Sequence, residues 1–218
     1  MKAFVFDAYG TLFDVHSVVT TCDRLFPARG MELSRLWRQK QLEYSWLRSL
    51  MGRYLDFTTV TADALGHACS ALGLTLSEET RATLLAAYDH LSPYPEVPGT
   101  LARLAGSGRA ILSNGTPAMI EAVVRNAGLA ASFDALVSVD SLGIYKPHPS
   151  VYRHATQILG VQATDVRFVS SNYWDIAGAT AFGFRTFWIN RSGIQPDNLG
   201  IEPFAVLSSL DELIRYLD

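Results

Sequence analysis

The sequence predicts an α/β fold: a doubly wound, Rossmann-like parallel sheet that carries an inserted helical domain. Short runs rich in Val, Ile, Phe and Ala alternate with helical patterns, and most of these runs end in polar or small residues. Such alternation is typical of a parallel sheet, which keeps its ligand chemistry at the carboxyl ends of its strands. A further observation, the long interval 7–109 between the first two runs, predicts the insertion.

Five segments have the composition and length of buried strands, because β-branched and aromatic residues dominate them and turn-forming residues flank them. A strand–helix–strand crossover needs only about a dozen residues, far fewer than the first interval holds. The expected strands are Ala3–Phe6, Ala110–Leu112, Ala135–Val139, Val166–Val169 and Thr186–Ile189.

The insertion, residues 15–92, is expected to be almost entirely helical. Its clearest helical segment is SRLWRQKQLEYSWLRSLMGRY, residues 34–54. Trp46, Leu47 and Leu50 help to form an apolar side of this helix, and the charged residues fall elsewhere. A helix of this kind packs its apolar side against another part of the molecule.

Two further helices are expected in the insertion, at 57–72 and 77–91, and the second follows a Ser-Glu-Glu-Thr signal for a helix start. A stretch rich in proline and glycine then predicts a stiff return to the sheet. The insertion is therefore expected to separate the two parts of an α/β core domain, residues 1–14 and 93–218.

Composition excludes several classes of function. Hydrophobic residues make up 49% of the 218 residues and charged residues 18%, with a formal net charge of -3, which favours neither disorder nor a nucleic-acid-binding surface. No apolar run reaches the roughly 18 residues of a membrane span, and the N-terminus resembles a strand more than a signal peptide, so we expect a cytoplasmic protein without membrane contact. Cys22 and Cys69 have no metal or redox spacing and are expected to be packing residues.

Four strand-end positions carry side chains suited to chemistry. Asp7 follows the first strand, Ser113 and Asn114 follow the second, Lys146 stands in IYKPHPSVY, and Asp175 ends SSNYWD. Each alone has an ordinary explanation as a turn, cap or surface residue. Parallel packing brings these loops to one edge of the sheet, so together they predict a cleft with two carboxylates, a hydroxyl and an ammonium group.

The order of DAYGT, LSNG, YKPHPSVY and SSNYWD resembles that of the haloacid dehalogenase superfamily across essentially the whole chain. Members of the superfamily have DxDGT at the first strand, Ser or Thr at the second, then a Lys and an acidic last loop. WRQKQLEYSW in the insertion and SSNYWD narrow the resemblance to the L-2-haloacid dehalogenases. The resemblance implies a parallel-sheet core and a helical cap that closes over the active site.

Two departures from the superfamily pattern concern the leaving group and the metal. Phosphatases of the superfamily have an acid two residues after the nucleophile, whereas this chain has Tyr9, and a phenol is a poor acid near neutral pH. The last loop has Ser171 in place of its first acid, which removes a hard oxygen ligand for magnesium. We therefore expect no metal, no cofactor, and a leaving group such as halide that departs without a proton.

The resemblance implies a two-step hydrolysis of short-chain L-2-haloacids. Asp7 would attack carbon 2 opposite the halogen and form an ester with inversion, after which water would attack the ester carbonyl and release a D-2-hydroxyacid. Asp175, held by neighbours such as Ser171 and Asn172, would activate that water. Lys146 would pair with Asp7 and Asp175 and balance their charge.

The resemblance also implies how the substrate is held. Ser113 and backbone N–H groups at Ala8 and Asn114 would bind its carboxylate. Arg38 would receive the halide with help from Asn114. Helical periodicity does not distinguish this arginine from the others in the insertion, so its choice rests on the match of WRQKQLEYSW to the family. An apolar wall is expected from Tyr9, Leu42, Phe57 and Trp174.

Four further residues support the site according to the same resemblance. Thr11 would orient the nucleophile, although a threonine in such a turn is equally well a backbone cap. Tyr152 would donate a hydrogen bond rather than act as an acid, and Ser170 and Asn172 complete the expected catalytic set. His148 is not expected to act as a base, because nothing in the sequence orients it.

The sequence leaves three alternatives open: a magnesium-dependent phosphatase of the same superfamily, a non-catalytic binding protein on this scaffold, and displacement of another leaving group or of a strained ring at carbon 2. Tyr9 and Ser171 disfavour the phosphatase, and the joint presence of the charged set disfavours the binding protein. The resemblance also implies a homodimer through cap helices. Trp46, Leu47 and Leu50 suit that role unless they pack inside the cap.

Overall fold

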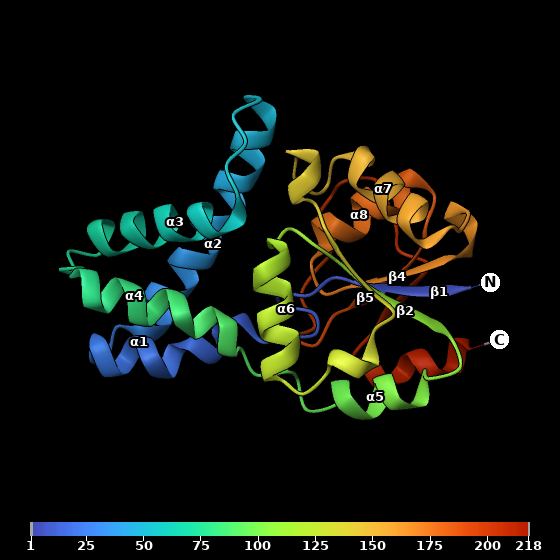
Figure 1. Ribbon diagram of the computed structural model, residues 1–218, viewed down its shortest axis with the longest axis horizontal. Coiled ribbons are helices and arrows are strands. Elements are labelled where there is room, and N and C mark those ends of the chain that lie inside the picture. Colours follow the sequence, from blue (N-terminus) through green and yellow to red (C-terminus); the bar gives the residue numbers. More distant parts are fainter. Residues whose placement is uncertain (1, 218) are drawn as a thin grey trace.

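The computed structural model describes residues 2–217, and a six-stranded parallel sheet forms its centre (Figure 1). The strand order is β3-β2-β1-β4-β5-β6, which confirms the predicted doubly wound α/β fold. Because β1 lies between β2 and β4, the residues that follow these three strands meet at one edge of the sheet. The strands are β1 (Ala3–Phe6), β2 (Gly108–Ser113), β3 (Ala135–Ser138), β4 (Val166–Ser170), β5 (Arg185–Ile189) and β6 (Ala205–Leu207).

The structure corrects some of the expected strand boundaries and adds a strand. β2 begins at Gly108 and ends at Ser113, so this serine belongs to the strand itself. Val139 lies outside β3 and precedes a 3₁₀ helix at Asp140–Leu142. β6 is not predicted because it is only three residues long and Val206 is exposed on it, which leaves no pattern of buried residues to detect.

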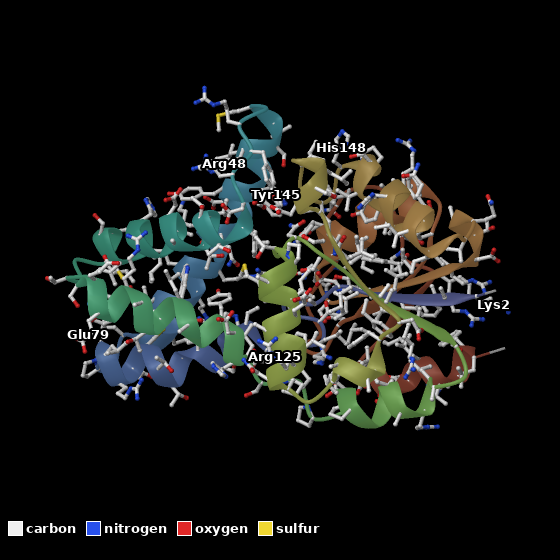
Figure 2. The ribbon with its side chains drawn as sticks, viewed as in Figure 1. Lys2, Arg48, Glu79, Arg125, Tyr145 and His148 are labelled. Atoms are coloured by element: carbon white, nitrogen blue, oxygen red, sulfur yellow. The ribbon has the colours of Figure 1, made fainter. Side chains whose placement is uncertain are left out.

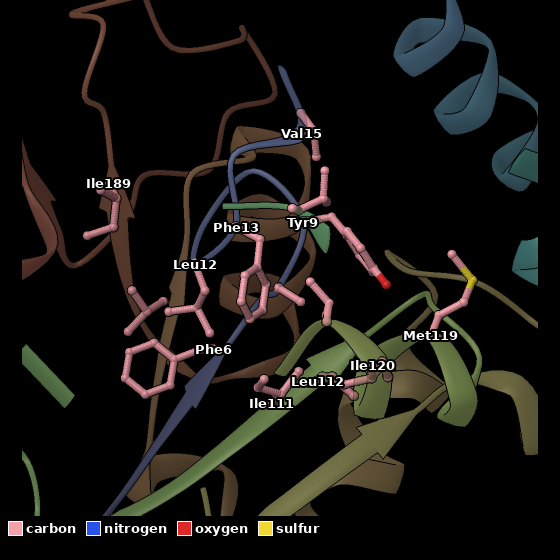
Figure 3. Packing of buried hydrophobic residues seen from close by; sticks show 14 of the residues in the cluster. Phe6, Tyr9, Leu12, Phe13, Val15, Ile111, Leu112, Met119, Ile120 and Ile189 are labelled. Atoms are coloured by element: carbon pink, nitrogen blue, oxygen red, sulfur yellow. The ribbon is translucent and has the colours of Figure 1, made fainter. Parts of the chain in front are cut away.

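Helices cover both faces of the sheet. Figure 1 shows α7 and α8 above the strands in this view and α5 below them, with α6 beside the helices of the insertion. β1 contributes Phe4, Val5 and Phe6 to the core, all of them fully buried, and Figure 3 shows Phe6 among its aliphatic neighbours. The helices are α5 (Val97–Arg103), α6 (Pro117–Asn126), α7 (Pro149–Leu159) and α8 (Tyr173–Phe182).

Four helices of the insertion lie to one side of the sheet, at the left of Figure 1. The helix expected at residues 34–54 begins earlier, at Gly30, and ends earlier, at Leu50. Its end is set by Gly52, which adopts the left-handed conformation (φ 63°) that commonly terminates helices. The four helices are α1 (Val19–Leu25), α2 (Gly30–Leu50), α3 (Phe57–Ala71) and α4 (Glu78–Ala87).

α3 and α4 begin where the sequence predicts. Asp56 and Ser77 cap them by accepting hydrogen bonds from the backbone N–H groups of Thr59 and Thr80. α4 ends at Ala87, where a 3₁₀ turn takes over, so this helix is shorter than expected.

The chain leaves and re-enters the α/β part through two segments that pair with each other. Phe13 and Pro93 form an antiparallel bridge, and the Asp14 N–H donates to the Ser92 carbonyl at 2.8 Å. This pairing lies at the predicted junctions of core and insertion. The division into two domains stays a prediction, which the paired segments support.

Gly178 allows α8 to pack closely against the segment that carries Lys146. A Cβ atom at this position would lie 2.5 Å from the Pro147 Cβ and 2.6 Å from the Tyr152 hydroxyl oxygen. Non-bonded atoms do not approach this closely, so any larger residue would push α8 away from these two neighbours. The glycine therefore helps to place residues predicted for the active site.

We expect Gly178→Ala to lower the free energy of unfolding by about 1–3 kcal/mol, the usual cost of overpacking. Gly66→Ala in α3 is the matched control, because a Cβ there meets nothing within 4 Å and alanine favours a helix over glycine by about 0.8–1.0 kcal/mol. Urea unfolding of both variants measures the two effects. If both substitutions were stabilising, the close approach at Gly178 would be absent.

Candidate active site

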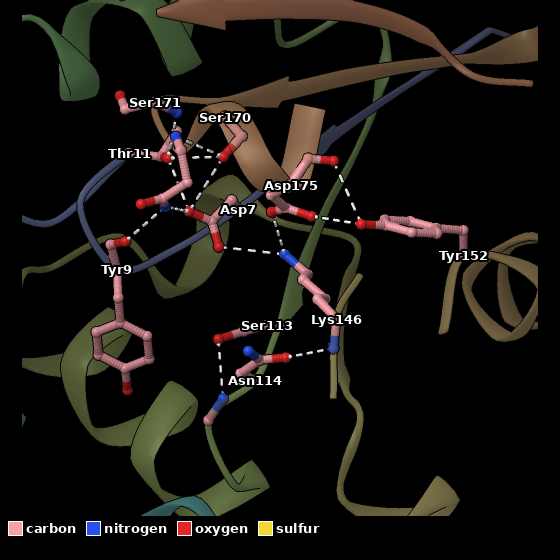
Figure 4. A network of polar contacts seen from close by, with 12 residues as sticks. Asp7, Tyr9, Thr11, Ser113, Asn114, Lys146, Tyr152, Ser170, Ser171 and Asp175 are labelled. Atoms are coloured by element: carbon pink, nitrogen blue, oxygen red, sulfur yellow. Dashed lines mark hydrogen bonds and ion pairs between the residues drawn. The ribbon is translucent and has the colours of Figure 1, made fainter. Parts of the chain in front are cut away.

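The carboxylate of Asp7 follows β1 and is almost fully buried, with 5% of the residue exposed. Its Oδ2 accepts hydrogen bonds from Thr11 Oγ1 and Asn172 Nδ2, both at 2.8 Å, and a longer one from Ser170 Oγ at 3.4 Å (Figure 4). Its Oδ1 accepts one from Lys146 Nζ at 3.1 Å. Three donors thus fix Oδ2, whereas Oδ1 has one partner among the described residues and keeps a lone pair for another contact.

The ammonium group of Lys146 is buried between two carboxylates. Its Nζ lies 3.1 Å from Asp7 Oδ1 and 2.8 Å from Asp175 Oδ2. The Lys146 backbone N–H donates to Asn114 Oδ1 at 3.0 Å, which ties this loop to the end of β2. Burial lowers the pKa of Lys146, but the charges of Asp175 and Asp7 outweigh burial and raise this pKa above its ordinary value. The lysine therefore stays protonated.

Asp175, in the first turn of α8, is the second buried acid of the site. Tyr152 Oη donates to its Oδ1 at 2.8 Å while Lys146 holds its Oδ2, so both carboxylate oxygens have donors. Burial raises the pKa of Asp175 to about 6; Lys146 opposes this shift and Asp7 adds to it. An acid with this pKa exchanges protons near neutral pH, as a general base must.

The turn after β4 is tied to the turn after β1. The Ser171 N–H donates to Thr11 Oγ1 at 2.8 Å, and the Asn172 N–H donates to Ser170 Oγ at 3.1 Å. Asn172 Nδ2 also donates to the Tyr9 carbonyl at 3.3 Å. These bonds fix the orientations of the Thr11, Ser170 and Asn172 side chains, which all contact Asp7 Oδ2.

The residues of this site do not fit a magnesium ion. In phosphatases of the superfamily, the nucleophile, a backbone oxygen and acids of the last loop hold the metal. Here Asn172 Nδ2 donates to both corresponding oxygens, Asp7 Oδ2 and the Tyr9 carbonyl, and Ser171 stands in place of an acid and accepts a hydrogen bond from Arg191 at 2.9 Å. Magnesium requires oxygen ligands rather than amide and guanidinium donors. No group of three or more His, Cys, Asp or Glu in the described part of the chain is placed to hold a metal.

Arg191 is a site residue that the sequence analysis misses. Its Nη1 donates to Ser171 Oγ at 2.9 Å and its Nη2 to the Thr11 carbonyl at 3.0 Å, so it braces both turns. Glu96 accepts from its Nε at 2.8 Å, and the Tyr94 ring lies 3.8 Å from the guanidinium carbon. Its position shortly after β5 is the signal that could identify it, because the other core residues of the site also lie in segments that follow strands.

A small closed cavity lies beside Asp7. α2 closes it with Arg38, whose Nη2 donates to the Tyr9 carbonyl at 3.2 Å and whose Nη1 donates to Gln41 Oε1 at 2.6 Å. The cavity volume is about 10 Å³, room for about one water molecule. An organic acid can therefore enter only after lining residues move, which makes this the closed form of the site. The lining residues are Asp7, Tyr9, Arg38, Leu42, Phe57, Ser113, Asn114 and Trp174.

Most of the predicted site residues thus come together, and Ala8 is the exception. Ala8 is fully buried but does not line the cavity, and its carbonyl accepts backbone hydrogen bonds from Leu12 and Phe13 that close the turn after β1. The residues predicted as catalytic, apart from Arg38 and Ser113 in the cavity wall, form one connected network. Its members are Asp7, Thr11, Lys146, Tyr152, Ser170, Asn172 and Asp175.

Two side chains near the cavity are unsuited to proton transfer. The Tyr9 hydroxyl is buried, has no hydrogen-bond partner within residues 2–217, and has its pKa raised by burial. Tyr9 therefore contributes its ring and its carbonyl to the site. His148 caps α7, where its Nδ1 accepts from the Ser150 N–H at 3.3 Å, and it does not line the cavity.

The protein belongs to the haloacid dehalogenase-like hydrolases, since the model of this family matches residues 1–183. Within the family, the chain is 52% identical to the (S)-2-haloacid dehalogenase of Pseudomonas sp. (strain YL), over 100% of the chain and 95% of the relative. It is 54% identical to the (S)-2-haloacid dehalogenase of Xanthobacter autotrophicus, over 88% of the chain and 76% of the relative. These matches confirm the resemblance inferred from the motifs.

The fold agrees with the sequence matches. The structure of L-2-haloacid dehalogenase from Xanthobacter autotrophicus with chloropropionic acid covalently bound has a TM-score of 0.94 and 44% sequence identity to this chain. The match covers 100% of this chain and 98% of that one. Sequence and fold therefore place the chain with the 2-haloacid dehalogenases of the family over its full length.

We expect Lys146→Met to lower the free energy of unfolding at pH 7 by about 3–5 kcal/mol, because it leaves Asp7 and Asp175 buried without a cation. The loss of stability should be smaller at pH 5, because protonation of Asp175 removes its repulsion with Asp7. Lys40→Met is the matched control: Lys40 pairs with Glu43 near the surface, and such pairs contribute little. Urea unfolding at both pH values measures the effect. A Lys146 variant as stable as the Lys40 variant would contradict the buried ion cluster.

Proposed function

We propose that the protein hydrolyses short-chain L-2-haloacids to D-2-hydroxyacids, with inversion at carbon 2, through an ester on Asp7 and without a metal or cofactor. The observation that carries the proposal is the fixed carboxylate of Asp7 beside a closed cavity that also holds Arg38. Relatives at 52% and 54% identity are (S)-2-haloacid dehalogenases, and a related structure contains covalently bound chloropropionic acid. These matches support the same reaction for this chain.

In the first step, Asp7 Oδ1 attacks carbon 2 on the side opposite the halogen. The carbon–oxygen bond forms as the carbon–halogen bond breaks, and the halide leaves with the bonding electron pair. Oδ1 is suited to the attack because Lys146 is its one described partner, whereas three donors hold Oδ2. Arg38 receives the halide, since a guanidinium group stabilises an anion without transferring a proton.

The carboxylate, the halide and the side chain of the substrate must all be placed for the site to select one enantiomer. Ser113 and Asn114 line the cavity at the end of β2, and we assign the carboxylate to them and to backbone N–H groups near Ala8. With the carboxylate here, the halide at Arg38 and Asp7 opposite the halide, hydrogen and carbon 3 take the two remaining directions around carbon 2. Only the L form then places carbon 3 toward the apolar wall of the cavity, which includes Leu42, Phe57 and Trp174. Inversion follows from attack opposite the halide.

In the second step, water attacks the carbonyl carbon of the Asp7 ester. Asp175 takes a proton from this water and returns it to the departing alkoxide oxygen as the ester bond breaks. The hydroxyacid leaves with the former Oδ1, and Asp7 keeps the water oxygen and releases the second proton. Lys146 and Tyr152 hold Asp175 in place for this role.

Four residues around Asp7 act by positioning. Thr11, Ser170 and Asn172 hold Oδ2, which turns Oδ1 toward the cavity. Arg191 holds the two turns that carry these residues and does not line the cavity itself.

The alternatives are less well supported. A magnesium-dependent phosphatase needs a cation where Asn172 Nδ2 lies and an acid where Tyr9 stands. A non-catalytic binding protein has no use for a buried cluster of two acids and a lysine, which is costly to maintain. Displacement of another leaving group, or of a strained ring, at carbon 2 fits the same residues, and the chloride-release test below measures dehalogenation itself.

We also propose a cytoplasmic homodimer in which residues 15–92 form the cap. Leu47, Leu50 and Met51, at the end of α2, are 50%, 84% and 61% exposed, and such an apolar group suits contact with a second copy. Trp46 packs against Trp174 instead of facing outward. Within residues 2–217, no helix has the length and hydropathy needed to cross a bilayer.

Incubation with each enantiomer of 2-chloropropionate, in the presence of a chelator, tests the proposed reaction. We expect chloride release from the L form alone, with D-lactate as the product, because only that form places its methyl group against the apolar wall while Asp7 lies opposite the halide. Asp7→Asn is the control and should reduce chloride release by at least about 10³-fold. Equal turnover of both enantiomers would contradict the stereochemical assignment, and phosphatase activity that a chelator abolishes would favour the alternative.

The pH dependence of ester hydrolysis tests the role of Asp175. The pKa of Asp175 is about 6 in the free enzyme, and the charge of Asp7 helps to raise it above the ordinary value of 3.8. Esterification removes that charge, so in the ester the ionised fraction of Asp175 should fall about tenfold per pH unit below a midpoint that lies under pH 6. The ester-hydrolysis rate in a single turnover should fall in proportion, and Asp175→Asn should release one halide per site and accumulate the ester. Rapid-quench mass spectrometry follows both species. Normal multiple turnover by Asp175→Asn would contradict the assignment.

A further inference from the structure

Both terminal nitrogens of the Arg38 guanidinium group donate hydrogen bonds. Nη2 donates to the Tyr9 carbonyl at 3.2 Å, and Nη1 donates to Gln41 Oε1 at 2.6 Å. The first bond joins the insertion to the turn after β1, whereas the second lies within α2. A movement of α2 away from Asp7 therefore breaks the first bond and leaves the second intact.

Gln41 is a polar residue at a fully buried position, so its amide group needs hydrogen-bond partners. Its Oε1 accepts from Arg38, and its Nε2 donates to Thr61 Oγ1 of α3 at 2.7 Å. Thr61 is also buried, with 2% of the residue exposed. The Gln41 side chain thus connects the arginine of the cavity wall to the neighbouring helix.

The hydroxyl group of Thr61 determines which way the amide of Gln41 faces. Thr61 Oγ1 donates its single hydrogen to the Phe57 carbonyl at 2.6 Å, and a carbonyl oxygen can only accept. Thr61 Oγ1 must then accept from Gln41, which requires the NH₂ group of the amide on this side. The amide oxygen is therefore the end that faces Arg38, where the opposite orientation would bring two donors together.

A second hydrogen bond fixes the same part of α2 against α3. Trp37 Nε1 donates to the Thr61 carbonyl at 2.8 Å, and the Trp37 side chain is fully buried. Thr61 thus holds α2 through its backbone and through its side chain. Gln41 is therefore a fixed support for the Arg38 side chain.

The acceptors that hold Arg38 carry no charge. Arg38 forms no ion pair with a carboxylate in residues 2–217. Arg48, further along α2 and labelled in Figure 2, instead pairs with the Asp63 carboxylate of α3 at 2.9 Å. A carboxylate would compete with an incoming anion, whereas an amide oxygen orients the guanidinium group and leaves its positive charge available.

We propose that Gln41 is a positioning residue for the first chemical step: its amide oxygen, oriented by Thr61, directs the Arg38 guanidinium group at the departing halide without neutralising it. This inference rests on the proposed function, in which Arg38 receives the halide. Gln41 does not line the cavity, so it acts through Arg38. Because the halide has left before water attacks the ester, Gln41 affects the formation of the Asp7 ester and not its hydrolysis.

A single turnover of L-2-chloropropionate by excess enzyme tests the proposal. Chloride release reports ester formation, and the delay between chloride and lactate release reports ester hydrolysis. We expect Gln41→Met to slow chloride release about 10- to 100-fold, less than the 10²- to 10³-fold typical for loss of a direct donor, and to leave the delay unchanged. Gln41→Glu retains the shape of the side chain but pairs Arg38 with a charge, so it should slow chloride release at least as much.

Substitutions of Thr61 test the orientation of the amide without changing Gln41. Thr61→Val removes the hydroxyl group and should slow chloride release about 2- to 10-fold, the effect of one neutral hydrogen bond. Thr61→Ser retains the hydroxyl group and should restore the wild-type rate. Ser45→Ala is the matched control, because Ser45 is a buried residue of α2 whose hydroxyl donates to the Leu42 carbonyl of the same helix, and both steps should be unchanged.

Arg38→Met separates an effect that passes through this arginine from a direct effect of Gln41. The substitution alone should slow chloride release about 10²- to 10³-fold. Adding Gln41→Met to it should slow chloride release by less than about twofold more, because two residues that act as one unit are not additive.

Wild-type chloride release by both Gln41→Met and Thr61→Val overturns the proposal. Equal slowing of both steps also overturns it, because Gln41 then supports the fold in general, and so does a full further loss in the Arg38→Met background. Wild-type chloride release by Gln41→Glu overturns the requirement for a neutral acceptor. Failure of the proposed function is distinct from these results: the wild-type protein then releases chloride from neither enantiomer of 2-chloropropionate.

Discussion

One buried ammonium group between two buried carboxylates is the constraint on which the site depends. Lys146 lies within 3.1 Å of Asp7 and 2.8 Å of Asp175, and it joins loops that follow separate strands. Because two acids share one cation, the remaining carboxylate oxygens need neutral donors, which Thr11, Asn172 and Tyr152 supply. Burial raises the pKa of Asp175 to about 6. The same cluster thus provides a fixed carboxylate for attack on carbon and a second one for proton exchange.

The neighbours of this cluster restrict the chemistry that the superfamily fold performs here. Asn172 donates from its amide to the two oxygens that hold magnesium in related phosphatases, and Arg191 contacts Ser171, which replaces an acid. Tyr9 is a buried phenol whose raised pKa makes it a still weaker acid. A leaving group in this site therefore departs without a proton and without a metal, which suits halide. A shared fold leaves such differences to individual side chains.

Sequence patterns predicted the sheet and the core residues of the site, because buried strands have a distinct composition and parallel strands end at one edge. β6 escapes sequence prediction because three residues, of which Val206 is exposed and Leu207 buried, are too few to form a pattern. Arg191 escapes it although this residue shortly follows a predicted strand. Arg38 was found through family resemblance, since helical periodicity does not distinguish it from other arginines of the insertion. The contact of Trp46 with Trp174 joins segments far apart in the chain, and no local pattern encodes it.

The origin of the oxygen in the product tests the central claim, an ester on Asp7, most directly. Excess enzyme would complete one turnover of L-2-chloropropionate in ¹⁸O-labelled water, and mass spectrometry would locate the label. We predict lactate with an unlabelled hydroxyl and ¹⁸O in the peptide that contains Asp7, because water attacks the aspartyl carbonyl. Label entirely in the lactate hydroxyl, with none in that peptide, would contradict the account and indicate direct attack of water on carbon 2.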